Sequence, residues 1–162
     1  MKVTIDGQSI EVEAGTTILQ AARMIGGEVV PPAMCYYSKL KGTGGKCRCC
    51  LVDVTKGSEA DPRPMPKLVA SCVTGCQDGM EIASKASPRV QEARKSVTEF
   101  LLINHPLDCP VCDQAGECDL QNLSFEHGNP KSRFIEEKRT FEPENIGDKI
   151  QLHMNRCILC QR

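Results

Sequence analysis

The sequence predicts an α+β protein built from small domains in succession. Three observations support this prediction: apolar residues alternate near the N-terminus as in β-strands, apolar residues recur at helical spacing in two other segments, and aromatic residues are scarce. The 162 residues suit one ordinary domain or two to three very small ones. With four Phe, two Tyr and no Trp, each hydrophobic core must be small, and such domains usually depend on disulfides or metals. The eleven cysteines are the candidates for that role.

The first segment, residues 2–14, has the pattern of a β-hairpin. Apolar and polar residues alternate on both sides of Asp6-Gly7, which is a turn signal. Thr16 and Thr17 then offer an N-cap to a helix whose apolar residues share one face, and Gly26-Gly27 ends that helix.

A glycine-rich loop follows, beginning after Pro31-Pro32, and short strands come after it. The strands are expected at residues 51–54, 68–70 and 80–82, with an exposed proline-rich connection over 56–66. Two strands, a helix, a cysteine loop and three further strands outline a small α+β domain over residues 1–85.

A second, helical domain is predicted over residues 86–127. Ser87-Pro88 is an N-cap followed by proline at the first helical position, and helical spacing continues until His105-Pro106. Another short helix is expected beyond Gly116. Residues 128–162 then form a polar connector and the beginning of a further, incomplete domain.

Charge and hydropathy exclude several classes of function. The net charge of −1 gives no basic surface for nucleic acid. No run approaches the roughly 20 apolar residues that span a bilayer. The polar, strand-like N-terminus lacks the apolar region of a signal peptide. Because the cysteine count is odd and several cysteines form C-x2-C pairs, reduced thiols in a cytosolic compartment are expected rather than disulfides.

The first group of candidate ligands is Cys35-x11-Cys47-x2-Cys50-x21-Cys72. Three thiols on one glycine-rich loop and a fourth from a distant strand are typical of a [2Fe–2S] site. Cys49 offers an alternative third ligand, and Cys76 could compete with Cys72 as the fourth. A zinc site or plain buried thiols are the alternatives, although a zinc ribbon would use two C-x2-C knuckles.

The second group is His105-x3-Cys109-x2-Cys112-x5-Cys118, with one imidazole and three thiols in fourteen residues. This ligand set fits zinc or an iron–sulfur cluster with one unusual ligand, and the neighbouring first group favours the cluster. A neutral imidazole in place of a thiolate makes such a site one charge less negative, which favours reduction.

The third group is Cys157-x2-Cys160, which is the spacing that begins the ligand run of bacterial [4Fe–4S] proteins. Two thiols cannot complete a cluster, so we expect either that the sequence is truncated before the remaining ligands or that the pair is left open. His127 and His153 are expected at the surface. Four basic residues interleaved with two glutamates are expected to form a solvated face or to dock a neighbouring subunit: Lys131, Arg133, Lys138 and Arg139, with Glu136 and Glu137.

At these motifs the chain resembles the iron–sulfur region at the N-terminus of the large subunit of respiratory complex I, NADH:quinone oxidoreductase. The matching stretches are Pro32-Ala-Met-Cys35-Tyr, Gly45-Lys-Cys47-Arg-Cys-Cys50-Leu-Val, Ala70-Ser-Cys72, His105-Pro-Leu-Asp-Cys109-Pro-Val-Cys112-Asp-Gln-Ala-Gly-Glu-Cys118-Asp-Leu-Gln and Arg156-Cys157-Ile-Leu-Cys160. The motif of one His and three Cys is the most specific of these. Cys49 and Cys76 are not ligands expected from the resemblance, which favours Cys50 as the third.

The resemblance implies a β-grasp [2Fe–2S] ferredoxin domain, then a small helical domain with a His-ligated [4Fe–4S] cluster, then the truncated start of a [4Fe–4S] ferredoxin-like domain at Cys157. It implies electron transfer from a flavin-containing, NADH-oxidising subunit toward quinone. The implied partners are this subunit and other peripheral-arm subunits, and the chain would associate with the membrane only through the assembled complex. The expected location is the cytoplasmic side of the plasma membrane of a bacterium.

The chain itself shows no complete active site. No G-x-G-x-x-G follows a predicted strand, so the nicotinamide is expected to bind a partner. Two other functions stay open: an iron–sulfur relay of an NAD-reducing hydrogenase, [FeFe] hydrogenase or NAD-linked formate dehydrogenase, and a zinc-stabilised interaction module.

Overall fold

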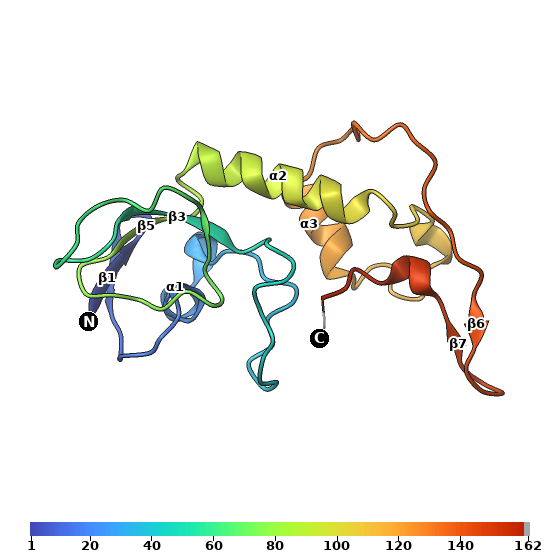
Figure 1. Cartoon of the computed structure of the whole chain (residues 1–162), viewed down its shortest axis with the longest axis horizontal. Coiled ribbons are helices and arrows are strands. Elements are labelled where there is room, and N and C mark those ends of the chain that lie inside the picture. Colours follow the sequence, from blue (N-terminus) through green and yellow to red (C-terminus); the bar gives the residue numbers. More distant parts are fainter. Residues whose placement is uncertain (161–162) are drawn as a thin grey trace.

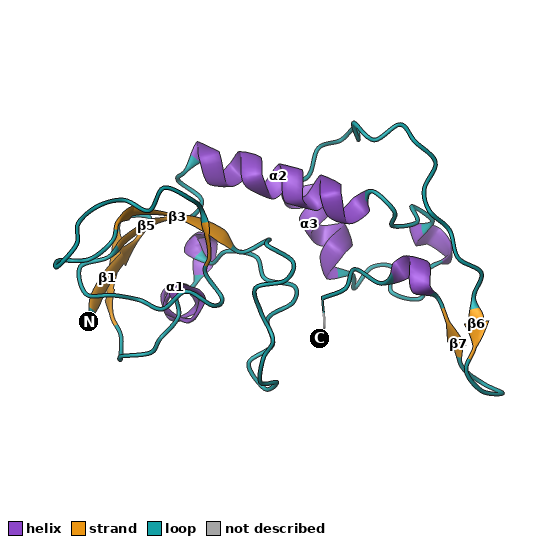
Figure 2. Ribbon diagram, in the orientation of Figure 1, coloured by secondary structure: helices purple, strands orange, loops and turns teal. Residues whose placement is uncertain are grey.

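The computed structural model describes residues 1–160, which form a sheet-containing first half and a second half of two helices, short elements and long loops. Figure 1 shows the sheet and α1 at one end of the molecule and α3 with the β6–β7 hairpin toward the other. The helix α2 (Pro88–Leu102) runs from the sheet toward the second half (Figure 2).

The first half is built on a five-stranded mixed sheet with the order β2-β1-β5-β3-β4. β1 pairs antiparallel with β2 and parallel with β5, and β3 pairs antiparallel with both β5 and β4. The strands are β1 (Lys2–Ile5), β2 (Gln8–Glu11), β3 (Leu51–Lys56), β4 (Val69–Ala70) and β5 (Glu81–Ala83). The hairpin and all three later strands predicted from the sequence are therefore confirmed.

The hairpin turn and the first helix follow their local sequence signals. Asp6 and Gly7 both have positive φ, 46° and 81°, as a two-residue hairpin turn requires. In α1 (Ile18–Ile25), Thr17 is the N-cap and forms a capping box with Gln20, a contact worth about 1 kcal/mol. Gly26 ends the helix, as predicted.

The main core lies between α1 and the sheet. α1 turns its apolar face inward, and the strands contribute the alternate residues that face it. The core consists of Val3, Ile5, Val12, Ile18, Ala21, Ala22, Val29, Val52, Val54, Cys76, Met80 and Ile82.

The sheet is tied to α2 by a carboxylate. Asp6 accepts backbone hydrogen bonds from Ser84, Lys85 and Ala86, at 2.7, 2.8 and 3.4 Å, which fixes the segment that leaves β5. The side chain of Ser87 then caps α2 by accepting from the Val90 N–H. The predicted start of this helix is confirmed, but the helix ends at Leu102, three residues before the predicted end.

The second half contains short elements joined by long loops. They are α3 (Asp119–His127), β6 (Glu144–Asn145) and β7 (Gln151–Leu152), with 3₁₀ turns at Cys109–Val111 and Met154–Arg156, and a further 3₁₀ turn in the first half at Gly27–Val29. The helix predicted beyond Gly116 is confirmed. The small β6–β7 hairpin was not predicted, because its residues are polar and exposed.

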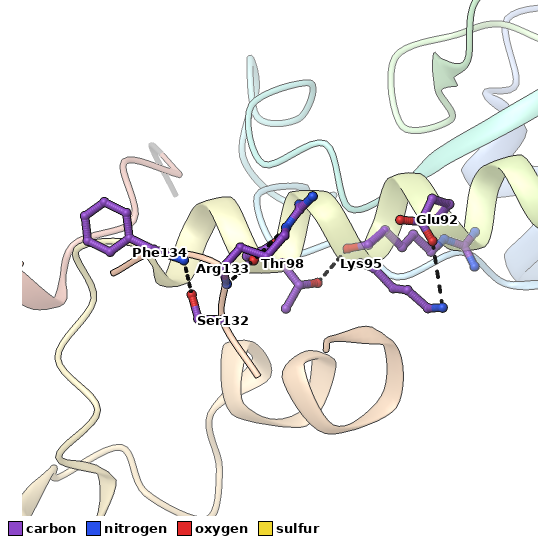
Figure 3. A network of polar contacts seen from close by, with 8 residues as sticks. Glu92, Lys95, Thr98, Ser132, Arg133 and Phe134 are labelled. Carbon is purple, nitrogen blue, oxygen red and sulfur yellow. Dashed lines mark hydrogen bonds and ion pairs between the residues drawn. The ribbon is translucent and has the colours of Figure 1, made fainter. Parts of the chain in front are cut away.

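The basic segment after residue 128 is largely exposed, as expected for a solvated face, but two of its basic residues also contact α2 and its end. Arg133 donates to the Glu99 carboxylate of α2 through its backbone N–H (2.7 Å) and its guanidinium (Nε–Oε2 2.9 Å). Lys138 Nζ donates to the carbonyls of Leu102 and Ile103, at 2.6 and 2.9 Å, where α2 ends. Figure 3 shows Arg133 beside α2, with Ser132 and Phe134 next to it. These contacts fasten the connector to the chain's own helix.

The described residues contain no helix that combines the length and the apolar character needed to cross a bilayer.

Candidate iron–sulfur sites

The first site lies in the loop between α1 and β3, together with the turn that follows β4. Cys35, Cys47 and Cys50 come from the loop and Cys72 from the turn, and all four thiols are buried. All eleven cysteines of the chain are free thiols in the structure. The structure thus brings together four residues that span 38 positions of sequence, as the motif predicted.

The four thiols form two adjacent pairs. The sulfur atoms of Cys50 and Cys72 lie 3.3 Å apart, and Cys35 Sγ accepts the backbone N–H of Cys47 at 3.4 Å. Within residues 1–160, no three His, Cys, Asp or Glu side chains converge closely enough to chelate a single metal ion.

Backbone N–H groups of the glycine-rich loop point at the sulfur atoms. Gly45 N donates to Cys72 Sγ at 3.1 Å, and the backbone nitrogens of Lys46 and Cys47 donate to Cys35 Sγ at 3.3 and 3.4 Å. Such donors stabilise negative charge on sulfur, which is the state of a metal-bound thiolate.

The loop needs glycine to make this close approach. Gly44 has φ +110°, and a Cβ at this position would lie 3.3 Å from Cys72 Sγ and 3.2 Å from Val73. A side chain here would therefore strain the backbone and crowd the sulfur.

The thiol contacts divide the site into stronger and weaker acids. The hydrogen bond from Cys49 lowers the pKa of Cys47 to about 5. The hydrogen bond from Cys72 likewise lowers the pKa of Cys50 to about 6. The pKa of Cys72 is raised by its contact with Cys50 and by burial, and burial raises the pKa of Cys35. Two of the four thiols are therefore poised as thiolates near neutral pH, the form that binds metal.

The two other cysteines of this half have different surroundings. Cys49 is buried beside Cys47, with its sulfur 3.8 Å from the Cys47 carbonyl oxygen, and the contact with Cys47 raises the pKa of Cys49. Cys76 belongs to the main core under the sheet, where burial raises its pKa.

The second site surrounds a cavity between the end of α2 and the start of α3. His105, Cys109, Cys112 and Cys118 all border one hollow, as the spacing predicted. Three of them, without Cys109, also border an adjoining cavity of about 640 Å³. Cys109 opens a 3₁₀ turn and Cys118 is the N-cap of α3, so these short elements position the thiols.

The imidazole of His105 fits a metal ligand better than a surface group. Its Nδ1 atom is buried and has no hydrogen-bond partner in the described structure. Burial is the largest cause that lowers the pKa of His105, and the nearby cations Arg156 and Lys138 lower it further. The ring is therefore neutral at physiological pH, and a neutral imidazole is the ligand form.

An ion pair between Asp108 and Arg156 borders the second site. The sequence spacing did not predict it. Arg156 donates through both terminal nitrogens to the Asp108 carboxylate, at 2.7 and 2.9 Å, and this bidentate contact lowers the pKa of Asp108. The partners are 48 residues apart and each lies next to a candidate ligand, Cys157 and Cys109.

The last two thiols are not brought to one cavity. Cys160 is half-buried and borders the 640 Å³ cavity of the second site, whereas Cys157 is exposed and borders a separate cavity of about 320 Å³. The Leu159 N–H lies 3.4 Å from Cys157 Sγ, and Leu159 itself has φ +54°. Of the histidines expected at the surface, His153 borders the 640 Å³ cavity and His127 is half-buried on α3.

An apolar boundary joins the first and second sites. Met34, next to Cys35, is buried and also borders the 640 Å³ cavity. Residues around it come from the first loop, from α2, from α3 and from the last described residues. The boundary consists of Met34, Cys35, Cys47, Cys49, Val97, Leu101, Leu102, Cys118, Leu120, Leu123, Ile158 and Cys160. The two sites are therefore neighbours, with this apolar boundary and the 640 Å³ cavity between them.

Two family models match the chain. Residues 1–87 match the "2Fe-2S iron-sulfur cluster binding domain", and residues 94–133 match the "NADH-ubiquinone oxidoreductase-G iron-sulfur binding region". The first model covers the sheet and the four-thiol loop, and the second covers the segment from α2 to Arg133.

Curated relatives align over the whole chain. It is 48% identical to the NADH-ubiquinone oxidoreductase 75 kDa subunit of Reclinomonas americana and 47% identical to the G-type subunit of NADH-quinone oxidoreductase from Rickettsia bellii (strain RML369-C). It spans 22% of the length of each relative.

A solved structure shares the fold. It is the "Crystal structure of NAD+-reducing [NiFe]-hydrogenase in the H2-reduced state". The sequences are 31% identical and the TM-score is 0.81, and the match covers 98% of this chain and 62% of that chain. Together with the family models, these likenesses confirm the resemblance seen in the motifs. The chain belongs to the family of 2Fe–2S iron–sulfur cluster binding domains, here joined to the 4Fe–4S binding region of the G-type and 75 kDa subunits of NADH-quinone oxidoreductase.

Proposed function

We propose that this chain is an electron-transfer segment of NADH:quinone oxidoreductase, which relays electrons through iron–sulfur clusters from a flavoprotein partner toward quinone. The observation that carries the proposal is the first site, where two adjacent pairs of buried thiols accept hydrogen bonds from loop N–H groups. The relatives named above support the choice of complex.

The ligands of the [2Fe–2S] cluster are assigned to the two thiol pairs. A cluster of this kind takes four thiolates, two at each iron. Cys35 and Cys47 would hold one iron, and Cys50 and Cys72 the other, because Cys35 Sγ accepts the Cys47 N–H and the sulfurs of Cys50 and Cys72 lie 3.3 Å apart.

The [4Fe–4S] cluster is assigned to His105, Cys109, Cys112 and Cys118, the four residues around the hollow beside α3. The unpartnered Nδ1 of His105 and its lowered pKa support an imidazole ligand there. Cys157 and Cys160 would serve a further [4Fe–4S] site together with ligands outside this sequence.

The domain division that goes with these assignments is a β-grasp [2Fe–2S] domain over 1–85, a His-ligated [4Fe–4S] domain over 86–127, and a connector with the start of a further domain over 128–162. The helix α1 packed on a mixed sheet supports the first of these. Residues 161 and 162 lie outside the described part of the chain.

When bound, an iron–sulfur cluster supplies a reversible one-electron redox centre. The chain's own residues do the rest. They bury the thiols, direct N–H donors at the sulfur atoms, keep His105 neutral, and fill the space between the sites with apolar side chains. None of this requires a nucleophile or a general base.

Electron entry and exit would depend on other subunits. We propose a flavin-containing NADH-oxidising subunit as the donor and other peripheral-arm subunits as neighbours, on the cytoplasmic side of a bacterial plasma membrane. The bacterial relatives are subunits of the same quinone-reducing complex, which supports this placement.

A second candidate is the iron–sulfur relay of an NAD-reducing hydrogenase, because a chain with that title shares the fold over nearly the whole length of this protein. The two candidates share the clusters and differ in the assembly. A zinc-stabilised module is disfavoured by the match to two iron–sulfur family models.

Affinity purification of the tagged chain from its native cells, followed by reduction assays on the captured complex, tests the proposal. We expect a flavoprotein to copurify and NADH to bleach the visible absorption of the chain's clusters. Bleaching by hydrogen gas with a nickel-containing partner would select the hydrogenase relay instead. Capture of a colourless, zinc-loaded chain under anaerobic conditions would overturn both.

A further inference from the structure

A buried cation on α2 has no carboxylate partner. Arg94 keeps only 5% of its surface exposed. Its Nη2 donates to Ser84 Oγ at 3.0 Å and to the Leu51 carbonyl at 3.4 Å, but its Nε is buried without a hydrogen-bond partner. None of the ion pairs within residues 1–160 includes Arg94. Burying a guanidinium is costly unless a negative group compensates its charge.

Asp6, the carboxylate that favours the Arg94 cation through charge, is already engaged in other contacts. Asp6 raises the pKa of Arg94, and burial lowers it more strongly. However, Asp6 accepts three backbone hydrogen bonds from residues 84–86, so its oxygens serve the turn after β5 rather than the guanidinium. Asp6 therefore compensates Arg94 only from a distance.

The other groups that favour the Arg94 cation are cysteine sulfurs of the first site. The Leu51 carbonyl that Arg94 contacts follows Cys50 directly in the chain. Cys50 and Cys49 both act on Arg94 through charge, in the direction that favours the cation. The guanidinium thus comes from the α2 side of the molecule to the loop that holds the first four thiols.

We propose that Arg94 is the buried counter-charge of the [2Fe–2S] cluster and raises that cluster's reduction potential. This inference rests on the proposed assignment of the cluster to Cys35, Cys47, Cys50 and Cys72. Four thiolates make the bound cluster negative overall, and uptake of one electron without a proton makes it more negative by one charge. A fixed cation in a poorly solvated interior stabilises the reduced form more than the oxidised form.

The placement of Arg94 on α2 gives the inference a structural consequence. α2 begins beside the sheet and ends beside the second site, so the counter-charge of the first cluster belongs to the helix that also leads to the ligands of the second. The potential of the first cluster would therefore depend on α2 being docked against β3.

The test is an EPR-monitored redox titration with dithionite as the electron donor, on the cluster-loaded full chain. Arg94→Met and Arg94→Gln remove the charge, and Arg94→Lys keeps it. At a given applied potential, we expect the ratio of reduced to oxidised [2Fe–2S] cluster to fall at least tenfold in both neutral variants. For a one-electron couple this is a downward shift of the reduction potential by about 59 mV or more. Arg94→Lys should stay much closer to the wild type, and the [4Fe–4S] potential should be less affected in all three.

Lys95→Gln is the matched control, because it removes a cation from the same helix at a half-exposed position beside Glu92. Solvent screens that charge, so the potential should stay at the wild-type value. Neutral variants with the wild-type potential, or no lower than Lys95→Gln, would overturn the inference.

Two further outcomes are decisive. If the neutral variants do not fold, Arg94→Lys decides alone: a potential near the wild type supports the inference, and a tenfold loss of reducibility overturns it. A wild-type chain that holds no [2Fe–2S] signal overturns the proposed cluster as well, whereas a normal signal with unchanged variant potentials overturns only the role of Arg94.

Discussion

At the scale of single residues, the second site shows how one atom distinguishes a ligand from a surface group. His105 carries a buried nitrogen that no protein group satisfies, although more than about nine in ten buried polar groups in proteins find partners. A metal bond would use the imidazole that the fold keeps neutral. His153 borders the adjoining cavity but is exposed and contacts Gln151, so it is the weaker ligand candidate.

Replacing His105 by cysteine tests this assignment. His105→Cys should retain the [4Fe–4S] cluster and lower its reduction potential, because a thiolate adds one negative charge where the imidazole had none. Redox titration monitored by EPR measures the shift, and His153→Ala serves as the control that should leave the potential unchanged. A raised or unchanged potential in His105→Cys would contradict the ligand assignment.

At the scale of elements, the loop between α1 and β3 is organised by its glycines and not by regular hydrogen bonding. Local sequence could predict the flanking elements, because the Thr17 cap and the Asp6-Gly7 turn act within a few residues. The spacing of the cysteines could also predict that the four thiols of the first site lie together. It could not predict that Gly45 N would donate to Cys72, because this contact joins residues 27 positions apart.

Gly44→Ala is the sharpest change to make in this loop. The substitution adds strain on the order of 1–3 kcal/mol at a positive φ and places a methyl group against Cys72 Sγ. Gly42→Ala has the same kind of strain at φ +75° but meets no atom within 4 Å. We expect Gly44→Ala to lose bound iron and sulfide markedly more than Gly42→Ala, as measured on purified protein. Equal iron content in the two variants would show that the sulfur contact does not matter.

At the scale of the whole molecule, contacts far apart in sequence assemble the sites. Arg156 reaches Asp108 across 48 residues, and Arg133 reaches Glu99 across 34. Helical and strand periodicity identify which face of an element is buried, but they do not say which charged residues will meet across a connector. For this reason the sequence predicted the exposure of the segment after residue 128 but not its contacts with α2.

The fastening has a testable pH dependence. The hydrogen bonds from Arg133 lower the pKa of Glu99 below its usual value. A carboxyl whose pKa is lower in the folded protein than in the unfolded chain stabilises the fold. This contribution is fully present above the unfolded-chain pKa of about 4.3. It is lost as the pH falls through the folded-state pKa. Glu99→Gln should therefore speed amide hydrogen exchange around residue 133 at pH 7.

Glu92→Gln is the control for that measurement, because it removes another carboxylate from the same helix. The ion pair of Glu92 with Lys95 is long, at 3.8 Å (Figure 3). Exchange around Arg133 should stay at the wild-type rate in this variant. Equal rates in Glu99→Gln and the wild type would mean that Glu99 does not hold the connector.

The central claim is that the chain holds two complete and chemically different clusters, one on four thiols and one on His105 with three thiols. Low-temperature EPR of the anaerobically prepared, dithionite-reduced chain, with iron and acid-labile sulfide measured on the same sample, tests it most directly. We expect a [2Fe–2S] signal that persists at higher temperature and a [4Fe–4S] signal that broadens on warming, with Cys50→Ser weakening only the first and Cys112→Ser only the second. A single cluster type, or a cysteine substitution that removes both signals from a folded chain, would contradict the account.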